Sequence, residues 1–171
     1  MIKKFDLNKN SLKFNFDYNP HETVYLNKKM NNNTKLNIED IRRIALWKLD
    51  RIINIPDEVI EDLRKIADEK SLDIKDNKTQ KIIERLLLCE GVGFPMASTI
   101  LKFIRPDVFP IIDVRSYRAI FGVKLYSSQY SLEKYIKYVE EIYNIRDCLK
   151  IDLPLIDQQL YCFDKEFNGK I

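Results

Sequence analysis

The chain has 171 residues, 45% of them hydrophobic, and a net charge of +3 from 29 basic and 26 acidic side chains. This length and composition predict one domain with a sizeable core, and the mild charge permits nucleic-acid binding without requiring it. No apolar run has the length of a membrane span or the form of a signal peptide, so we expect a cytoplasmic protein that does not bind membranes.

The first 36 residues differ in pattern from the rest. The stretch SLKFNFDYNP, residues 11–20, alternates apolar and polar side chains, which predicts a short extended segment. The stretch NKKMNNNTK, residues 27–35, predicts a loop. We therefore expect residues 1–36 to form an extended N-terminal arm and loop. This arm would complete a pocket, pair with another chain or cover the core.

From Asn37 onward the hydrophobic spacing is helical. Asn37 is a suitable N-cap for a helix whose apolar face includes Ile38 and Ile41. Pro56 stands at the start of the next helix, and Gly122 at the end of a shorter one. The predicted helices span residues 37–53, 56–70, 77–90, 95–104, 114–121, 131–145 and 153–167. Residues 37–171 are thus predicted to form an all-α domain.

Cysteine and histidine usage predicts neither a metal nor a cofactor. Cys89, Cys148 and Cys162 are scattered, and His21 is the only histidine. Zinc sites and iron–sulfur clusters need ligands grouped together, so we expect reduced thiols. His21 follows Pro20 in a polar segment, which favours a surface histidine over a catalytic one.

Two of the four glycines, Gly91 and Gly93, stand one residue apart between two predicted helices. Glycine permits positive φ and close backbone approach. Pro95 suits the first turn of the following helix, where its missing N–H costs nothing. The amides of such a hairpin, together with the helix N-terminus, can bind a phosphate. A tight helix–helix connection without any ligand is the alternative.

The stretch GVGFPMASTIL followed by FPIID resembles the helix-hairpin-helix DNA glycosylase superfamily. Members of this family carry a glycine hairpin, a helix with small residues, and an apolar segment that ends in an essential aspartate. The aspartate here is Asp113, which follows Gly91 by 22 residues. FPIID is most similar to the branch that removes adenine opposite oxidised guanine, and IIDVR also resembles the 8-oxoguanine branch.

The resemblance implies a glycosylase-like fold that excises a damaged or modified base from duplex or single-stranded DNA. Asp113 would stabilise the positive charge that develops on the deoxyribose ring. The hairpin and the helix after it would contact the nucleic acid, with Lys102 and Arg115 as further candidates for phosphate contacts. The implied nucleic-acid-binding residues are Gly91, Val92, Gly93, Met96, Ala97, Lys102 and Arg115.

The sequence also departs from the family. Pro95 stands where bifunctional members carry a lysine nucleophile, so we expect a monofunctional enzyme that does not cleave the strand through a Schiff base. The cysteine cluster of the iron–sulfur branches is absent, and the chain is short for the family. Because the chain is short, we expect its base pocket to be smaller than that of the family or different from it.

Several assignments keep a structural alternative. Asp113 is also a suitable N-cap for the helix at 114–121, and Arg115 is also suited to pairing with acidic side chains. Trp47, with Lys48 beside it, is a candidate wall of the base pocket or a core side chain. For the whole protein, the alternatives are a non-catalytic helix-hairpin-helix DNA-binding module and an interaction protein that keeps the fold. The base and the oligomeric state stay open.

Overall fold

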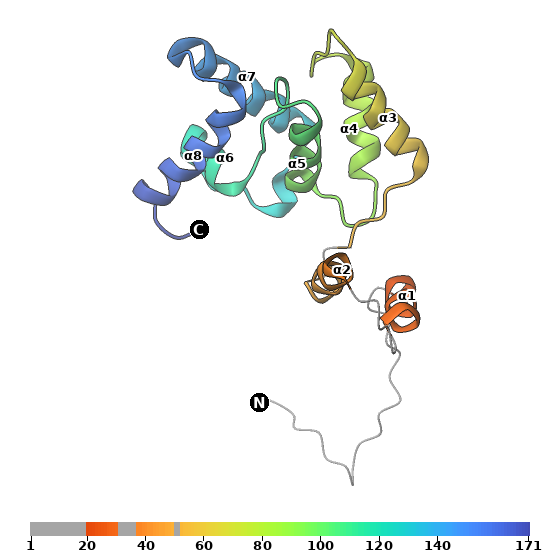
Figure 1. Ribbon diagram of the computed structural model, residues 1–171. Coiled ribbons are helices and arrows are strands. Elements are labelled where there is room, and N and C mark those ends of the chain that lie inside the picture. Colours follow the sequence, from red (N-terminus) through yellow and green to blue (C-terminus); the bar gives the residue numbers. More distant parts are fainter. Residues whose placement is uncertain (1–19, 31–36, 50–51) are drawn as a thin grey trace. The chain divides into compact units, whose positions relative to one another are not determined.

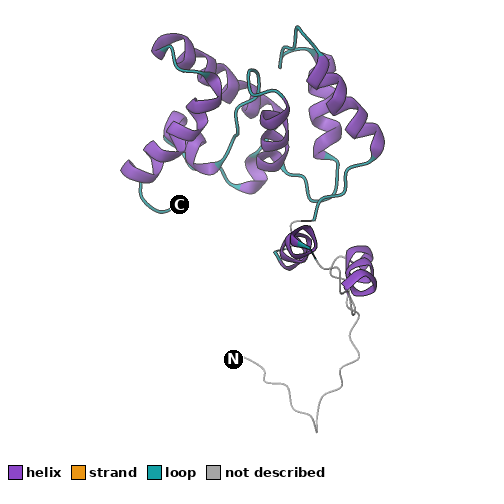
Figure 2. Ribbon diagram, in the orientation of Figure 1, coloured by secondary structure: helices purple, strands orange, loops and turns teal. Residues whose placement is uncertain are grey.

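The computed structural model describes residues 20–30, 37–49 and 52–171, and the regular elements in these ranges are all helices (Figures 1 and 2). Their only strand-type pairing is an isolated bridge between Asn54 and Glu90. The predicted all-α class is therefore confirmed. None of the helices in these ranges has the length and apolar character needed to cross a bilayer.

The chain divides into two compact units, Met1–Ile52 and Ile53–Ile171, whereas the sequence pattern placed the boundary after residue 36. In the first unit, α1 (Pro20–Met30) packs against α2 (Ile38–Lys48). The prediction of an extended arm and loop is thus wrong for residues 20–30. The predicted extended segment at residues 11–18 lies outside the described residues.

The charge pattern explains why α1 is a helix. Pro20 occupies its first position, Glu22 lies in its first turn, and Lys28 and Lys29 lie in its last turn. Acidic side chains near the start of a helix and basic ones near its end complement the helix dipole. Three of the four asparagines that predicted a loop come after Met30, but Asn27 lies within α1, so the loop prediction began too early in the chain.

The pairing of α1 with α2 is largely polar. Arg43 Nη2 donates to Glu22 Oε2 at 2.8 Å, and Trp47 Nε1 donates to Thr23 Oγ1 at 2.9 Å. Asn37 caps α2 as predicted, because its side chain accepts from the second and third amides of the helix. The apolar face predicted for α2 is largely exposed, as for example at Ile38, Ile41 and Leu49.

The second unit consists of two groups of three helices around one core. One group contains α3 (Asp57–Asp68), α4 (Asn77–Leu87) and α5 (Phe94–Ile104). The other contains α6 (Val114–Phe121), α7 (Leu132–Leu149) and α8 (Leu153–Phe167), with a short 3₁₀ turn, Ser127–Gln129, before α7. Figure 1 shows α5 between α3 and α4 on one side and α6, α7 and α8 on the other.

The core of this unit joins the two groups through residues 105–113, which connect α5 to α6. Phe109 and Ile112 of this connection are fully buried beside side chains of α4, α5 and α7. Burying a large apolar side chain contributes about 1.5–3 kcal/mol to folding. Two such side chains therefore anchor the connection in the core and fix where Asp113, the next residue, stands. The fully buried side chains include Ile83, Leu86, Leu101, Phe109, Ile112, Val139 and Ile142.

Candidate functional site

The glycine hairpin begins with a tight turn over residues 89–92. The Val92 amide donates to the Cys89 carbonyl at 3.1 Å, and Gly91 stands at the third position of the turn with φ of 77°. A positive φ at that position is typical of a type II turn and favours glycine. Val92 is buried in the core and anchors the turn, while Gly91 is exposed.

Gly93 differs from Gly91 in position and in backbone conformation. It is the N-cap of α5 with φ of −93° and ψ of 174°, an extended conformation open to any residue. A Cβ added there would meet nothing nearer than Pro95 Cδ, at 4.0 Å. Neither strain nor packing inside the chain therefore requires glycine at this position. Its missing side chain leaves the first turn of α5 open to a molecule approaching from outside.

Residues 108–112, hereafter the 108–112 segment, lead from α5 toward Asp113 in a non-helical conformation. Three tyrosine hydroxyls of α7 donate to carbonyls of this segment. Tyr143 bonds Val108 at 2.8 Å, Tyr135 bonds Pro110 at 3.0 Å, and Tyr138 bonds Ile111 at 2.8 Å. Buried carbonyls need partners, and here α7 supplies them in place of a neighbouring strand.

The amides of the same segment are also held by side chains. The Ile112 amide donates to Ser98 Oγ at 3.2 Å, and the Ile111 amide donates to Asp157 Oδ2 at 2.8 Å. Ser98 lies five residues after Gly93, about 7.5 Å along the axis of α5. The segment that ends at Asp113 is therefore tied both to the helix that follows the hairpin and to α8.

Lys102 lies where a phosphate contact is not possible in this structure. It is buried, and its Nζ donates to both carboxylate oxygens of Asp157 at 2.6 and 2.8 Å. Asp157 is buried as well and also accepts the Ile111 amide. The predicted phosphate role of Lys102 is therefore replaced by a structural one. Helical spacing did not reveal this, because the partner lies 55 residues away in the sequence.

Asp113 is the N-cap of α6, as its position before residues 114–121 predicted. Its Oδ1 accepts the Arg115 amide at 2.7 Å and the Ser116 amide at 2.8 Å. Its own amide donates to Ser116 Oγ at 3.2 Å, which completes a capping box. No hydrogen bond joins Oδ2 to any described residue, and the side chain is half-buried. One carboxylate oxygen is fixed, and the other accepts no hydrogen bond from the described residues.

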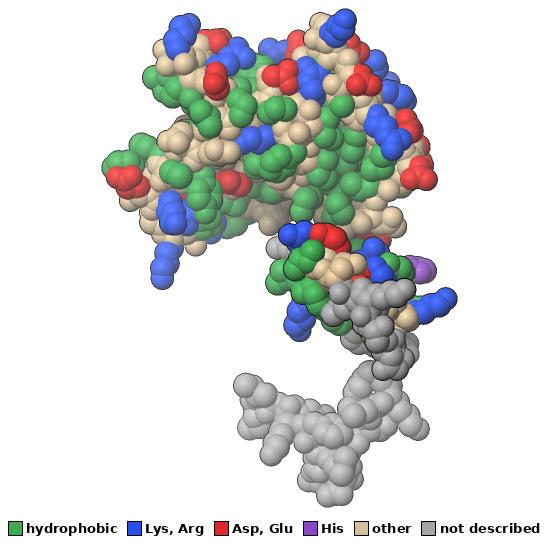
Figure 3. Space-filling model, in the orientation of Figure 1, with side chains coloured by type: hydrophobic (Ala, Val, Ile, Leu, Met, Phe, Trp, Pro, Cys, Tyr) green, Lys and Arg blue, Asp and Glu red, His purple; other side chains and the backbone are tan. Residues whose placement is uncertain are grey.

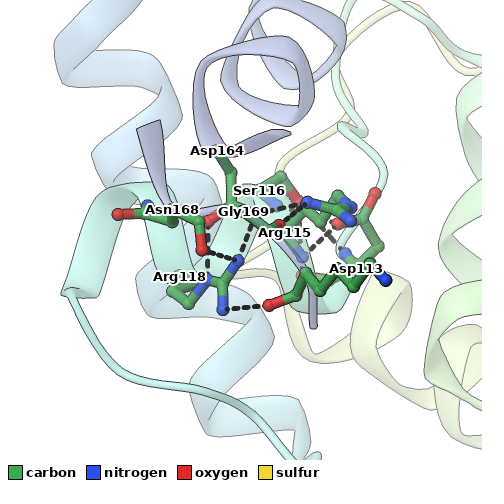
Figure 4. Close-up of polar contacts among 8 residues, drawn as sticks. Asp113, Arg115, Ser116, Arg118, Asp164, Asn168 and Gly169 are labelled. Atoms are coloured by element: carbon green, nitrogen blue, oxygen red, sulfur yellow. Dashed lines mark hydrogen bonds and ion pairs between the residues drawn. The ribbon is translucent and has the colours of Figure 1, made fainter. Parts of the chain in front are cut away.

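The arginines of α6 hold α8. Arg118 donates to Asp164 through Nε at 2.7 Å and Nη2 at 2.8 Å, and Arg115 Nη1 donates to Asp164 at 3.1 Å and to the Gly169 carbonyl at 2.9 Å (Figure 4). Asp164 is fully buried, and hydrogen bonding from Arg118 lowers the pKa of its carboxyl to about 2. Arg115 thus pairs mainly within the chain. This agrees with the alternative to a phosphate contact that the sequence analysis gave for it.

Two tyrosines of this region, Tyr138 and Tyr130, have raised pKa values. Burial is the main cause for Tyr138; the Ser116 side chain lowers its pKa, and the negative charges of Asp157 and Asp113 raise it further. Burial also raises the pKa of Tyr130 to about 12, with the charge of Asp113 as the second cause. These hydroxyls therefore stay protonated at neutral pH and can donate hydrogen bonds. No feature of the sequence pattern distinguished these tyrosines from ordinary packing residues.

The remaining predicted site residues divide between the two units. Ala97 is buried and Met96 half-buried on α5, just past the hairpin, so Met96 is the more accessible of the two. Trp47 and Lys48 lie on α2 of the first unit, where the Trp47 indole bonds to α1. That contact fits the structural alternative for Trp47, and the base-pocket role of both residues stays a prediction.

Surface charge does not mark an interface on the face shown in Figure 3, where basic, acidic and apolar side chains of the second unit are interspersed. Among residues 20–30, 37–49 and 52–171, no group of histidine, cysteine and acidic side chains is arranged to hold a metal ion. We therefore take the region around Asp113 and the hairpin as the candidate functional site. The sequence matches no protein-family model, no curated protein and no solved structure.

Proposed function

We propose that the chain is a monofunctional DNA glycosylase of the helix-hairpin-helix type, which hydrolyses the N-glycosidic bond of a damaged or modified base. The proposal joins the sequence resemblance to the geometry of Asp113. The observation that carries it is the different surroundings of the two carboxylate oxygens of Asp113. Oδ1 accepts hydrogen bonds from two amides of α6 at 2.7 and 2.8 Å, and Oδ2 is unpaired among the described residues.

A purely structural N-cap would be satisfied by serine or threonine as well. A carboxylate adds a negative charge, and three features keep it in place: the α6 amides, the buried 108–112 segment before it and the Ser116 hydroxyl. A fixed charge that need not reorganise stabilises a developing positive charge far better than a mobile one. Asp113 is therefore suited to electrostatic catalysis.

The reaction requires such a charge. As the bond between C1′ and the base nitrogen breaks, its electron pair leaves with the base and positive charge develops on the deoxyribose ring. Asp113 Oδ2 stabilises that charge. The oxygen of a water molecule then forms the new bond to C1′, its proton passes to the carboxylate and on to solvent, and the departed base takes up a proton from solvent. The products are the free base and an abasic site.

DNA binding would come from the hairpin. The exposed Gly91 and Gly93 and the first turn of α5 present backbone amides to a phosphate, with the positive end of the α5 dipole behind them. Pro95 in that turn supplies no amine for a Schiff base, which fits hydrolysis rather than strand cleavage. The target base would be flipped out of the duplex or presented on a single strand.

The first test needs no knowledge of the base. A duplex with a pyrrolidine at the abasic position carries a positive charge near C1′, and the tetrahydrofuran duplex is its neutral counterpart. We expect wild-type protein to bind the pyrrolidine duplex at least about tenfold more tightly, which corresponds to 1.4 kcal/mol. Asp113→Asn should remove the preference without unfolding the chain, because asparagine is an equally good N-cap.

The second test identifies the substrate. Duplexes and single strands would carry uracil, hypoxanthine, 8-oxoguanine, alkylated purines, hypermodified cytosines, or adenine opposite 8-oxoguanine, and products would be read with and without alkali. We expect release of one base class, seen as strand cleavage only after alkali, and a rate about 100-fold lower in Asp113→Asn. Asp152→Asn is the matched control, since Asp152 is an N-cap whose side chain makes no capping bond.

The outcomes separate the alternatives. Equal binding of both analogue duplexes and no base release by the wild type would overturn the glycosylase proposal. If DNA is nevertheless bound, and equally by wild type and Asp113→Asn, the non-catalytic DNA-binding module takes its place. Strand cleavage without alkali would contradict the monofunctional assignment.

A further inference from the structure

One tyrosine hydroxyl of the second unit differs from its neighbours. Tyr135, Tyr138 and Tyr143 each donate to a backbone carbonyl at 2.8–3.0 Å. The Tyr130 hydroxyl is also shielded from solvent, yet it makes no hydrogen bond within the described part of the chain. A buried hydroxyl without a partner is unfavourable. Such a group therefore requires an explanation, and a bound water or substrate atom is one.

The Tyr130 ring is held in a defined place. It stacks on Phe94 with ring centroids 6.1 Å apart, and Phe94 in turn contacts Tyr135 at 6.2 Å. Phe94 is the first residue of α5, directly after the hairpin, and lies one turn before Ser98, which holds the Ile112 amide. Tyr130 thus packs against the start of α5, the helix that Ser98 ties to the segment ending at Asp113.

Electrostatics agree with this placement. After burial, the negative charge of Asp113 is the second cause that raises the pKa of Tyr130. Two polar atoms of this region have no hydrogen-bond partner among the described residues. They are Asp113 Oδ2, an acceptor, and Tyr130 Oη, a donor and acceptor.

We propose that Tyr130 is a positioning residue that holds the attacking water together with Asp113. This inference rests on the proposed glycosylase function. Tyr130 Oη and Asp113 Oδ2 each form one hydrogen bond with the water, and Phe94 keeps the tyrosine ring in place. The water oxygen is left with a lone pair for C1′, on the face of the sugar opposite the departing base.

The roles of the two residues are distinct. Asp113 stabilises the positive charge on the ring and takes the proton as the water oxygen bonds to C1′. Tyr130 exchanges no proton in the net reaction and only orients the water. Removal of its hydroxyl should therefore slow the hydrolytic step without weakening the binding of a cationic sugar analogue, which contacts Asp113.

The test is Tyr130→Phe in the full-length chain, with Tyr126→Phe as the matched control, since Tyr126 is an exposed tyrosine four residues away. Three quantities would be measured: the single-turnover rate on the base that wild type releases fastest, the Kd for the pyrrolidine duplex, and the melting temperature. For Tyr130→Phe we expect a rate at least about tenfold lower, an unchanged Kd, and a melting temperature equal to or above that of wild type.

The named outcomes either support the inference or overturn it. A wild-type rate in Tyr130→Phe, with Asp113→Asn inactive, would remove the role of Tyr130 and leave the glycosylase proposal standing. A parallel loss of rate, pyrrolidine binding and melting temperature would show a structural role only. A wild-type protein without base release and without preference for the pyrrolidine duplex would overturn both proposals together.

Discussion

The two hairpin glycines differ in what their backbone conformation requires. Gly91 has φ of 77°, which only glycine adopts easily, whereas Gly93 has an extended backbone and open space where a Cβ would stand. Gly91 therefore contributes to the fold of the turn. The absence of a side chain at Gly93 matters only if another molecule approaches the backbone there.

Matched alanine substitutions separate these roles. We expect Gly91→Ala to lower the free energy of unfolding by about 1–2 kcal/mol, because alanine is strained at positive φ. Gly93→Ala should change it by less than about 0.5 kcal/mol. Gly93→Ala should instead weaken binding of the tetrahydrofuran duplex by about 1.4 kcal/mol, or tenfold. Urea titration and fluorescence anisotropy measure the two quantities, and unchanged binding by Gly93→Ala would argue against a DNA contact at the hairpin.

The buried carboxylate of Asp164 links the stability of the fold to pH. It is fully buried and accepts hydrogen bonds from Arg115, Arg118 and Asn168. The Arg118 contacts lower the pKa of its carboxyl to about 2, from an ordinary value of 3.8. Because the folded-state pKa is the lower one, this carboxylate stabilises the fold fully above about pH 4, and that contribution is lost as the pH falls toward 2.

Asp164→Asn tests this linkage. We expect it to lower the free energy of unfolding at pH 7 by about 3–5 kcal/mol, because it leaves two arginines without their buried partner. The variant should also lose part of the pH dependence between about pH 4 and 2. Chemical denaturation at several pH values measures both effects. Identical slopes below pH 4 in variant and wild type would contradict the role assigned to Asp164.

At the scale of elements, the sequence predicted the helices of the second unit well. The predicted span 114–121 agrees with α6, Val114–Phe121, and Asp113 caps it as expected. Amphipathic spacing and capping residues are local signals, which explains this success. The glycine turn between two helices was also predictable. The proposal that it binds DNA comes from the resemblance and not from the spacing.

The long-range polar contacts could not be predicted. Tyr135 and Tyr138 lie at helical spacing and pack in the core, but their hydroxyls also donate to carbonyls 25 and 27 residues away. Lys102 was expected at a phosphate and is instead buried against Asp157. Helical periodicity shows which face of a helix is buried and not which distant group meets it. One signal was present: buried tyrosines need hydroxyl partners, and a non-helical apolar segment offers carbonyls.

The Lys102–Asp157 pair yields a prediction at this scale. We expect Lys102→Met to lower the free energy of unfolding by about 3–5 kcal/mol, because the buried Asp157 would lose its ammonium partner. The salt dependence of DNA binding should stay unchanged, since the buried ammonium releases no counterion. Urea unfolding and Kd values at several salt concentrations test this. A smaller salt dependence with unchanged stability would restore the phosphate role.

At the scale of the whole molecule, the two units differ in how they are held together. The second unit has a continuous apolar core, from Val59 in α3 to Ile156 in α8, with contributions from every helix between them. In the first unit, Leu26 is the buried apolar side chain of the described residues, and polar contacts join α1 to α2. We therefore expect the second unit to fold without the first.

A shortened chain tests this independence. We expect residues 53–171 alone to remain helical and to unfold cooperatively, because the apolar core cluster lies entirely within them. Its melting temperature should lie within about 5 °C of the main transition of the full-length chain. Circular dichroism during heating measures both. A gradual, non-cooperative loss of helix in the shortened chain would show that the first unit is needed for the core to form.

The way the 108–112 segment is held has a consequence for amide hydrogen exchange. Exchange in irregular segments is usually fast, because their amides face water or open locally. The amides of Ile111 and Ile112 instead donate to Asp157 and Ser98, side chains that are themselves buried on α8 and α5. They can exchange only when those helices separate. Two amides outside any helix should thus exchange as slowly as the core, and so report on the opening of the whole second unit.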